Sequence, residues 1–451
     1  MDRKAFILNG EVKKVMWETS WPAVAAIVLY GINNFLDAIF VGYLINTQAL
    51  AAVGMAFPLS QIVLGFGRLV GTGAGATVSI WIGENRQDKL YTLFGSYNFL
   101  CIFFSLLCTV PAYIYAHELM AMMGAKGNLQ TIAVEYFRTT LIGTVFWIYG
   151  LALNMLIRAE GKMKTAAAMI AVGLVIDIIL KPIFISGFGM GVSGAAWATN
   201  CGMIIYSILG FYYYAKGKSS FVTDWKSISF DAEISKRILK LGLPEMILSV
   251  MGVIQSIIIF NAIAAYGTED DISFFTVLNR FFLFLLTPLF GLMRGLQPVV
   301  GMNFGAGQFE RARKFLKTYI LAGIAIVFPF FFIALFFPEP LIGLMLPGYS
   351  VSSHQILDFR LFFSVLPLLP VTVLALSYYP AVNESKKASF LVFLRQLILY
   401  IPLMLILPHY FGVKSIYWGS AAIEITVAVV TLFLLKNYKI KKLQPVTVEN
   451  K

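Results

Sequence analysis

Twelve apolar segments divide the chain, and they constrain its fold more than any other feature of the sequence. Each is about 20 residues long or longer, which is the length an α-helix needs to cross the hydrocarbon layer of a membrane. A helix also satisfies its own backbone hydrogen bonds there. The second and eighth segments are overlong, so we expect part of each to lie at an interface or to bend. The segments are 21–44, 49–82, 91–116, 131–156, 165–186, 191–215, 241–266, 272–302, 315–338, 355–382, 388–411 and 415–435.

The composition agrees with a membrane protein and argues against other classes. Hydrophobic residues make up 59% of the chain and charged residues 13%, whereas a soluble domain carries about a quarter charged residues. The net charge of +12 does not indicate nucleic-acid binding, because the basic residues lie in short gaps between apolar segments. The three cysteines fall inside apolar segments and the three histidines are scattered. We therefore expect no enzyme, no metal site and no cofactor.

The basic residues also predict how the chain is oriented. If the N-terminus is cytoplasmic, 26 lysines and arginines, Arg158 among them, fall in the inward-facing stretches and the tail, and the opposite loops hold only Lys126 and Lys414. Short cytoplasmic loops are enriched in Lys and Arg. We therefore predict a multi-pass protein of the cell (inner, cytoplasmic) membrane with both termini in the cytoplasm.

An internal repeat divides the chain into two halves. Four features recur at an offset of 222 residues, or 221 for the last, and six segments separate the copies. Because six is even, the halves have the same orientation, and parallel repeats of this kind place a binding cavity between them. We predict an N-lobe at 1–215, a cytoplasmic linker at 216–240, and a C-lobe with a basic cytoplasmic tail at 241–451. The repeated features are Pro22 and Pro244, Gly83 and Gly305, Arg138 and Arg360, and the turns before Trp197 and Trp418.

The first segment carries a polar stripe. Asp37 has Asn33 one turn earlier and Tyr30 two turns earlier, which puts all three on one helix face. Asn34 is adjacent. Such a stripe is expected to face the protein interior or a water-filled cavity. It is either a hydrogen-bonded clamp between helices or a carboxylate that takes up and releases a cation.

The fifth segment carries a second pair of charges. Asp177 and Lys181 are four residues apart, so they share a helix face in the favourable order. Pro182 follows and removes a backbone donor, which bends a helix. The pair is either a structural salt bridge or part of a functional site beside the bend.

The remaining charges in the segments receive simpler interpretations. Arg68 and Arg294 either line a cavity or sit at broken ends of the two long segments. Glu424 is a cavity candidate too, although we favour a structural pair with Arg395. Four more charges lie near segment ends, where long side chains reach the membrane surface: Arg138, Glu245, Arg280 and Arg360.

Several stretches together resemble the multidrug and toxic compound extrusion (MATE) transporters, within the wider multidrug, oligosaccharidyl-lipid and polysaccharide flippase superfamily. The resemblance covers nearly the whole chain, and no single motif is specific by itself. The stretches are Asn34-Phe-Leu-Asp37-Ala-Ile-Phe-Val-Gly42, Ala49-Leu-Ala-Ala-Val-Gly54 with Pro58, Gly189-Met-Gly-Val-Ser-Gly-Ala-Ala-Trp197, Leu241-Gly-Leu-Pro244, Gly295-Leu-Gln-Pro298 with Asn303-Phe-Gly-Ala306, and the region of Arg395 and Pro402.

The resemblance implies an all-α membrane fold of twelve helices in a V-shaped pair of six-helix lobes. It also implies a cation site in the N-lobe formed by Asp37, Tyr136 and Thr199. In the fifth segment the family pattern Asn-x-x-x-Asp-Pro is replaced by Asp177-Ile-Ile-Leu-Lys181-Pro182. Sodium needs oxygen ligands, and a lysine offers only donors. We therefore expect Lys181 to be a counter-cation for Asp37 and Asp177.

Two functions follow from this pattern. The first is a secondary antiporter that exports small organic compounds by alternating access. Its charge pattern favours coupling to protons rather than to sodium. The second is a flippase or exporter of an anionic or lipid-linked substrate, which Lys181 and the arginines favour. An integral-membrane enzyme is a third class, without a matching cluster of residues. We expect a monomer whose partners are its small-molecule substrate and membrane lipid.

Overall fold

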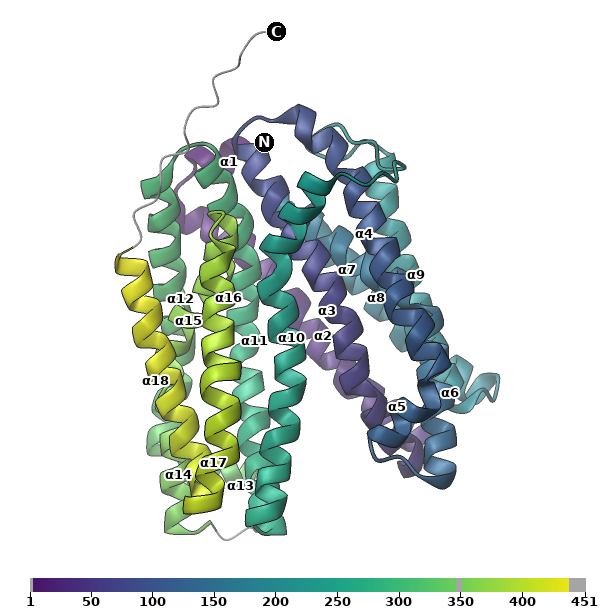
Figure 1. Cartoon of the computed structure of the whole chain (residues 1–451), viewed down its shortest axis with the longest axis vertical. Helices are drawn as coiled ribbons and strands as arrows, with labels where there is room; N and C mark the ends of the chain where they lie inside the picture. Colours follow the sequence, from purple (N-terminus) through teal and green to yellow (C-terminus); the bar gives the residue numbers. More distant parts are fainter. Residues whose placement is uncertain (1–2, 346–350, 438–451) are drawn as a thin grey trace.

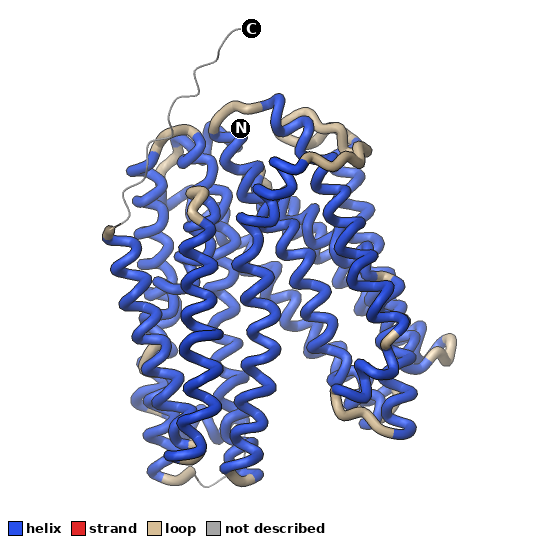
Figure 2. The backbone as a smooth tube through the Cα atoms, viewed as in Figure 1, coloured by secondary structure: helices blue, strands red, loops and turns tan. Residues whose placement is uncertain are grey.

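The computed structural model describes residues 3–345 and 351–437, and that part of the chain is helical without any strand (Figure 2). Eleven helices are long and apolar enough to cross a membrane, and a bent pair makes twelve if it is counted as one span. The predicted all-α membrane fold is therefore confirmed. The basic tail at 438–451 lies outside the described residues.

The helices follow one another with short connections. The first half contains α1 (Arg3–Asn9), α2 (Val12–Leu44), α3 (Thr47–Gly83), α4 (Gln87–Ile114), α5 (Ala116–Met122), α6 (Gly127–Ile142), α7 (Thr144–Ala159), α8 (Met163–Pro182), the π-helical turn η1 (Ile183–Gly187) and α9 (Gly191–Ala215). The second half contains α10 (Ala232–Tyr266), α11 (Glu269–Gly305), α12 (Phe309–Phe336), α13 (Pro338–Met345), α14 (Ser353–Phe363), η2 (Leu366–Leu368), α15 (Leu369–Ala381), α16 (Ser385–Phe393), η3 (Leu394–Tyr400), α17 (Ile401–Phe411) and α18 (Lys414–Lys436).

The two halves repeat the same irregularities. The span formed by α6 and α7 bends by 52° at Gly143. The corresponding span of the second half is interrupted between α14 and η2, at Ser364 and Val365, about 222 residues further on. Arg138 donates to the carbonyl of Tyr113, and Arg360 donates to the carbonyl of Leu335. Both partners of this hydrogen bond are therefore shifted by the repeat offset.

The two halves form two helical bundles that converge at one end and diverge toward the other (Figure 1). We call the converging end, which carries α1, the α1 end. Close backbone contact between α3 and α10 brings the lobes together there: a Cβ atom at Gly73 would overlap the Ile238 carbonyl, and one at Gly242 would overlap the Leu69 carbonyl. Small residues allow helices in membranes to approach this closely.

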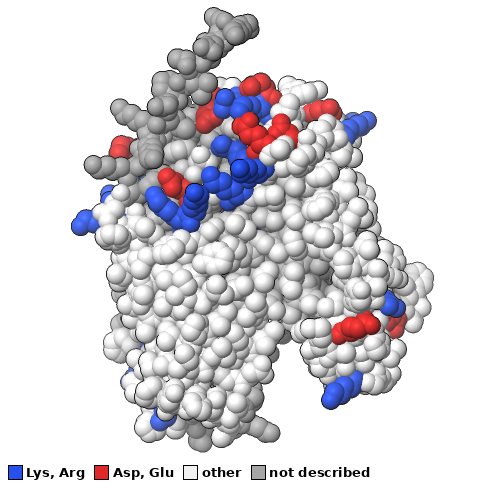
Figure 3. Space-filling model, in the orientation of Figure 1, with Lys and Arg blue, Asp and Glu red and all other residues white. Residues whose placement is uncertain are grey.

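The surface shows where the chain meets water and lipid. Charged side chains gather at the α1 end, and a broad uncharged band lies below them (Figure 3). Between the diverging lobes the molecule is hollowed, and the wall of this hollow is uncharged on the face shown (Figure 3). The hollow opens away from the α1 end.

Both overlong segments are continuous 37-residue helices, α3 and α11, and the expected bend or interfacial part of each stays a prediction. Two details differ from the sequence predictions. Helix α10 begins at Ala232, inside the predicted linker, so Glu245 lies well within a helix rather than near its end. Arg158, which we counted among the loop charges, is in the last turn of α7 and only 7% exposed.

Candidate functional site

Three charged side chains meet between α2 and α8. The Lys181 ammonium donates to Asp37 Oδ1, and it lies 3.2 Å from Asp177 Oδ1. The exposed fractions of the side chains are 2% for Lys181, 4% for Asp177 and 28% for Asp37. The expected contacts of Lys181 with both carboxylates are present, and Asp37 has the most exposed side chain of the three. We call these three residues the charge triad.

Neutral polar groups complete the coordination of the triad. Asn33 Nδ2 donates to Asp177 Oδ2 at 3.0 Å and lies 3.5 Å from Asp37 Oδ2. Thr199, on α9, donates its hydroxyl to Asp177 Oδ1 at 3.1 Å. Asp177 therefore accepts hydrogen bonds from an amide, a hydroxyl and an ammonium.

The backbone changes at the end of α8, next to the triad. Helix α8 ends at Pro182, and the chain continues as the π-helical turn η1. Proline removes a backbone donor from the ladder, and π-turns often lie at functional sites. Lys181 thus lies two residues before a change in helical pitch, and the bend expected from Pro182 stays a prediction.

The other predicted site residues have different positions. Tyr136 interacts electrostatically with Asp37 and Asp177, and its side chain is hydrogen-bonded to Thr140 rather than to either acid. Tyr30 interacts with the same two acids and also with Arg68 and Arg294.

Asn34, although next to Asn33, lies on an exposed part of α2. We find no side-chain hydrogen bond from it among the residues described. Its place in the candidate cavity therefore stays a prediction.

A second group of charges lies between the lobes. Arg68 on α3 donates to Ser249 on α10 at 2.9 Å, which joins the two lobes. Arg294 on α11 interacts electrostatically with Arg68, Glu245 and Tyr30. Neither arginine sits at a broken helix end, because α3 and α11 are continuous. The interpretation as broken helix ends is therefore wrong, and the interpretation as lining of an inter-lobe cavity stays a prediction.

Sequence reasoning missed one member of this group. Arg158 interacts electrostatically with Arg294, Tyr206 and Glu245. Its position after a long apolar run suggested a cytoplasmic loop, but the turn after α7 is buried. Gly161, which adopts φ +78° in a tight turn immediately after α7, indicates a turn in the sequence but not that Arg158 is buried.

Glu424 belongs to a separate pair in the second lobe. Arg395 Nε donates to Glu424 Oε1 at 2.7 Å, and the Glu424 side chain is 6% exposed. The expected pairing is therefore present, which supports the structural interpretation over a role in the cavity.

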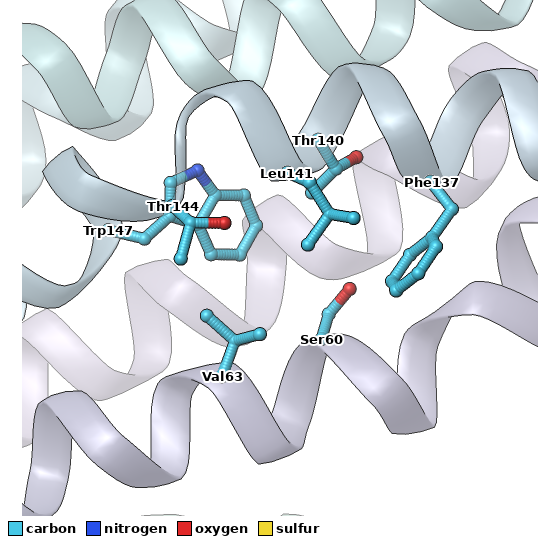
Figure 4. A pocket seen from close by; sticks show the side chains of 7 residues that line it. All are labelled: Ser60, Val63, Phe137, Thr140, Leu141, Thr144 and Trp147. Atoms are coloured by element: carbon cyan, nitrogen blue, oxygen red, sulfur yellow. The ribbon is translucent and has the colours of Figure 1, made fainter. Parts of the chain in front are cut away.

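A small cavity occurs beside the bend between α6 and α7. Its volume is about 10 Å³, which is space for at most one water molecule. Figure 4 shows its lining side chains, from α3 on one side and from α6 and α7 on the other. They are Ser60, Val63, Phe137, Thr140, Leu141, Thr144 and Trp147. The cavity is too small for an organic substrate, and it lies at the joint of a bent span.

Two membrane lobes around buried charges define a membrane transporter. The chain belongs to the MatE family, whose model matches residues 22–183 and 246–410. It is 23% identical over 430 residues to the multidrug export protein MepA of Staphylococcus aureus, covering 95% of this chain and 94% of that protein.

Solved structures share the fold. One is described as MATE in the bent conformation, with a TM-score of 0.89, 23% identity and 96% of each chain covered. Another, from Pyrococcus furiosus, has a TM-score of 0.86 and 24% identity, with 96% of this chain and 99% of that chain covered. Its description reads "Reverse polarity of binding pocket suggests different function of a MOP superfamily transporter".

Proposed function

We propose that this protein is a proton-coupled secondary antiporter that exports small organic compounds. One observation carries the proposal: a single lysine bridges a buried carboxylate, Asp177, and a partly exposed one, Asp37. Membership of the MatE family and the likeness to a multidrug export protein support export of small organic molecules. We further propose that the protein acts as a monomer in the cell membrane.

The chemistry of the triad favours protons over sodium. A sodium ion needs several oxygen ligands, and the space between the two carboxylates is taken by the Lys181 ammonium. An ammonium has donors only, and its charge repels a second cation at short range. A proton needs no such cavity, because it binds covalently to a carboxylate oxygen.

Protonation of Asp37 gives the triad two states. With all three groups charged the net charge is −1, and with Asp37 neutral it is 0. Breaking a buried ion pair costs roughly 3–5 kcal/mol, and moving a two-state population from 1:99 to 99:1 takes about 5.5 kcal/mol. The ion pair therefore has an energy of the size that a conformational switch requires. Release of Lys181 would act directly on η1, which begins two residues later.

The shape supports a direction of transport. The hollow between the lobes opens away from the α1 end (Figure 3). If the α1 end is cytoplasmic, this state releases substrate outside the cell and exposes Asp37 to protons there. Proton uptake would then favour the opposite state, which binds substrate from the cytoplasm.

The second candidate is export of an anionic or lipid-linked substrate. It is favoured by Lys181 in the N-lobe site and by the arginines between the lobes. The reversed polarity described for the binding pocket of the Pyrococcus furiosus neighbour supports the idea that this fold serves substrates of more than one charge.

Proteoliposomes containing the full chain test proton coupling. Organic dyes of either charge are loaded, and a pH gradient or a sodium gradient is imposed separately. We expect the pH gradient alone to drive export, and Asp37→Asn to lower that export at least about tenfold because it removes the proton-binding carboxylate. Asp88→Asn, an exposed acid in the first turn of α4, is the matched control. Export by the sodium gradient alone, or normal export by Asp37→Asn, contradicts the proposal.

Lys181→Asp provides a second test of the same site. It restores an oxygen ligand at the place where the family pattern has an aspartate. We expect proton-driven export to fall and export to become dependent on sodium. If the variant folds, binds a dye and still exports with the pH gradient alone, the coupling role of Lys181 is wrong.

A further inference from the structure

Three arginines from three helices converge between the lobes, and the described residues neutralise them only in part. Arg68 comes from α3, Arg158 from α7 and Arg294 from α11. Arg294 interacts electrostatically with both of the others. The acid in reach of Arg158 and Arg294 is Glu245, so the four groups together carry a net charge of +2. We call the three arginines the arginine cluster.

Close packing of the helices places the cluster. Arg68 donates to Ser249, one turn beyond Glu245 on α10. On the other side, a Cβ at Gly295, next to Arg294, would lie 3.1 Å from Ser20 of α2. Thr72, one turn beyond Arg68, lies 3.5 Å from the sulfur of Met155 on α7. The cluster therefore sits where α2, α3, α7, α10 and α11 meet.

Two of the three arginines have no acidic partner within the described part of the chain. Arg158 is 7% exposed, and its Nε has no hydrogen-bond partner there. Neither Arg158 nor Arg294 lies within salt-bridge distance of a described acid. Arg68 differs, because it donates to Ser249 and to Gln61. A buried charge without a partner is costly, and a bound anion would offset that cost for Arg158 and its neighbours.

We propose that the arginine cluster is the part of the substrate site that binds an anionic group, a carboxylate or a phosphate, of the exported compound. This inference rests on the proposed export function and names its substrate class. Guanidinium groups present planar pairs of donors that match carboxylate and phosphate oxygens. Arg68 and Arg294 are only partly buried, so a ligand between the lobes can reach them.

Tyr30 connects this site to the charge triad. It interacts electrostatically with Asp37 and Asp177 and also with Arg68 and Arg294. An anion on the cluster and a proton on Asp37 therefore both change the charge near this tyrosine. Binding at one site therefore alters the electrostatic energy of the other, which is what coupling of the two requires.

Two dyes with the same xanthene skeleton and opposite charge test the site. Binding of fluorescein, an anion, and of rhodamine 123, a cation, is measured by fluorescence anisotropy on the full chain in lipid nanodiscs, without any gradient. We expect fluorescein to bind at least about tenfold more tightly. Arg158→Gln and Arg294→Gln should each weaken fluorescein binding about tenfold or more, the loss expected for a hydrogen bond to a charged group.

Matched variants separate charge from folding. Arg294→Lys keeps the charge and should retain most of the fluorescein affinity. Arg360→Gln removes an exposed arginine that donates to a backbone carbonyl elsewhere, and it should bind like the unmodified protein. If the glutamine variants do not fold, the ratio of the two dye affinities in the unmodified protein decides.

Fluorescein binding that is absent, that is no tighter than rhodamine binding, or that both folded glutamine variants retain overturns the inference. Because the assay uses no gradient, its result is independent of proton coupling. If fluorescein binding depends on the arginines but no proton-driven export occurs, the anion site is supported and the antiport proposal is wrong. If protons drive export of rhodamine but not of fluorescein, the antiport proposal is supported and the anion site is wrong.

Discussion

At the residue scale, Glu160 is a buried acid outside the spans that holds two connections together. Its side chain is wholly buried in the turn after α7. It accepts hydrogen bonds from the hydroxyl of Tyr213 at 2.8 Å and from the hydroxyl of Tyr214 at 3.1 Å, both on α9. It also accepts from the backbone N–H of Ser220, in the connection to α10, at 2.6 Å. Burial raises the pKa of the Glu160 carboxyl above its ordinary value despite these bonds.

The raised pKa predicts how stability depends on pH. A carboxyl whose pKa is higher in the folded state binds its proton more tightly there, so protonation stabilises the fold. That contribution is fully present below the ordinary pKa of 4.5 and is lost as the pH rises through the folded-state pKa. We expect acidification from neutral pH to raise the melting temperature of the unmodified protein more than that of Glu160→Gln. Equal slopes in thermal unfolding of the two proteins would contradict this.

At the scale of elements, the contact between α3 and α10 determines how closely the lobes approach at the α1 end. Gly242 lies against the carbonyl of Leu69, and a Cβ there would overlap it. Gly252 lies on the same helix, and a Cβ at that position would meet no described heavy atom within 4 Å. The same substitution at the two glycines therefore separates packing from helix propensity.

Alanine at these two positions should have opposite effects. Within a helix, alanine is favoured over glycine by roughly 0.5–1 kcal/mol, so Gly252→Ala should be neutral or stabilising. Gly242→Ala should destabilise this closed arrangement by roughly 1–3 kcal/mol, because it overpacks a backbone contact. Thermal unfolding in nanodiscs and spin-label distances across the α1 end measure both effects. Unchanged stability and an unchanged lobe distance in Gly242→Ala would show that the contact does not limit the approach.

At the scale of the whole molecule, the distribution of charge predicts the orientation in the membrane. Charged side chains gather at the α1 end, beyond the broad uncharged band (Figure 3). Lys126 precedes α6 and Lys414 begins α18, so both lie on the connections of the opposite end. Because Lys and Arg are retained on the cytoplasmic side, this distribution predicts that the α1 end is cytoplasmic.

Reporter fusions test this orientation. A fluorescent protein joined to the C-terminus should fluoresce, because it folds in the cytoplasm. Alkaline phosphatase inserted at Gly412, in the loop before α18, should be active, because that loop would face the oxidising exterior. The reverse pattern at both positions would overturn the orientation and, with it, the direction of transport.

What the sequence by itself determined is what a single helix or a repeat can specify. The length of the apolar segments predicted the spans, and a constant offset predicted that Arg138 and Arg360 are equivalent. Asp177 and Lys181 could be paired from their spacing alone, because residues four apart share a helix face. The pairing of Glu424 with Arg395 was also expected, since each is a costly charge within neighbouring spans.

Only the tertiary structure decided which charges on different helices meet. Lys181 contacts Asp37 across 144 residues. Arg158 interacts electrostatically with Arg294, although the sequence placed Arg158 in a loop. A soluble helix shows which side faces the core through its apolar stripe, but a membrane helix is apolar on all sides. Its rotation and its neighbours are therefore set by close packing at small residues such as Gly73 and Gly242, which becomes visible only when all the helices are assembled.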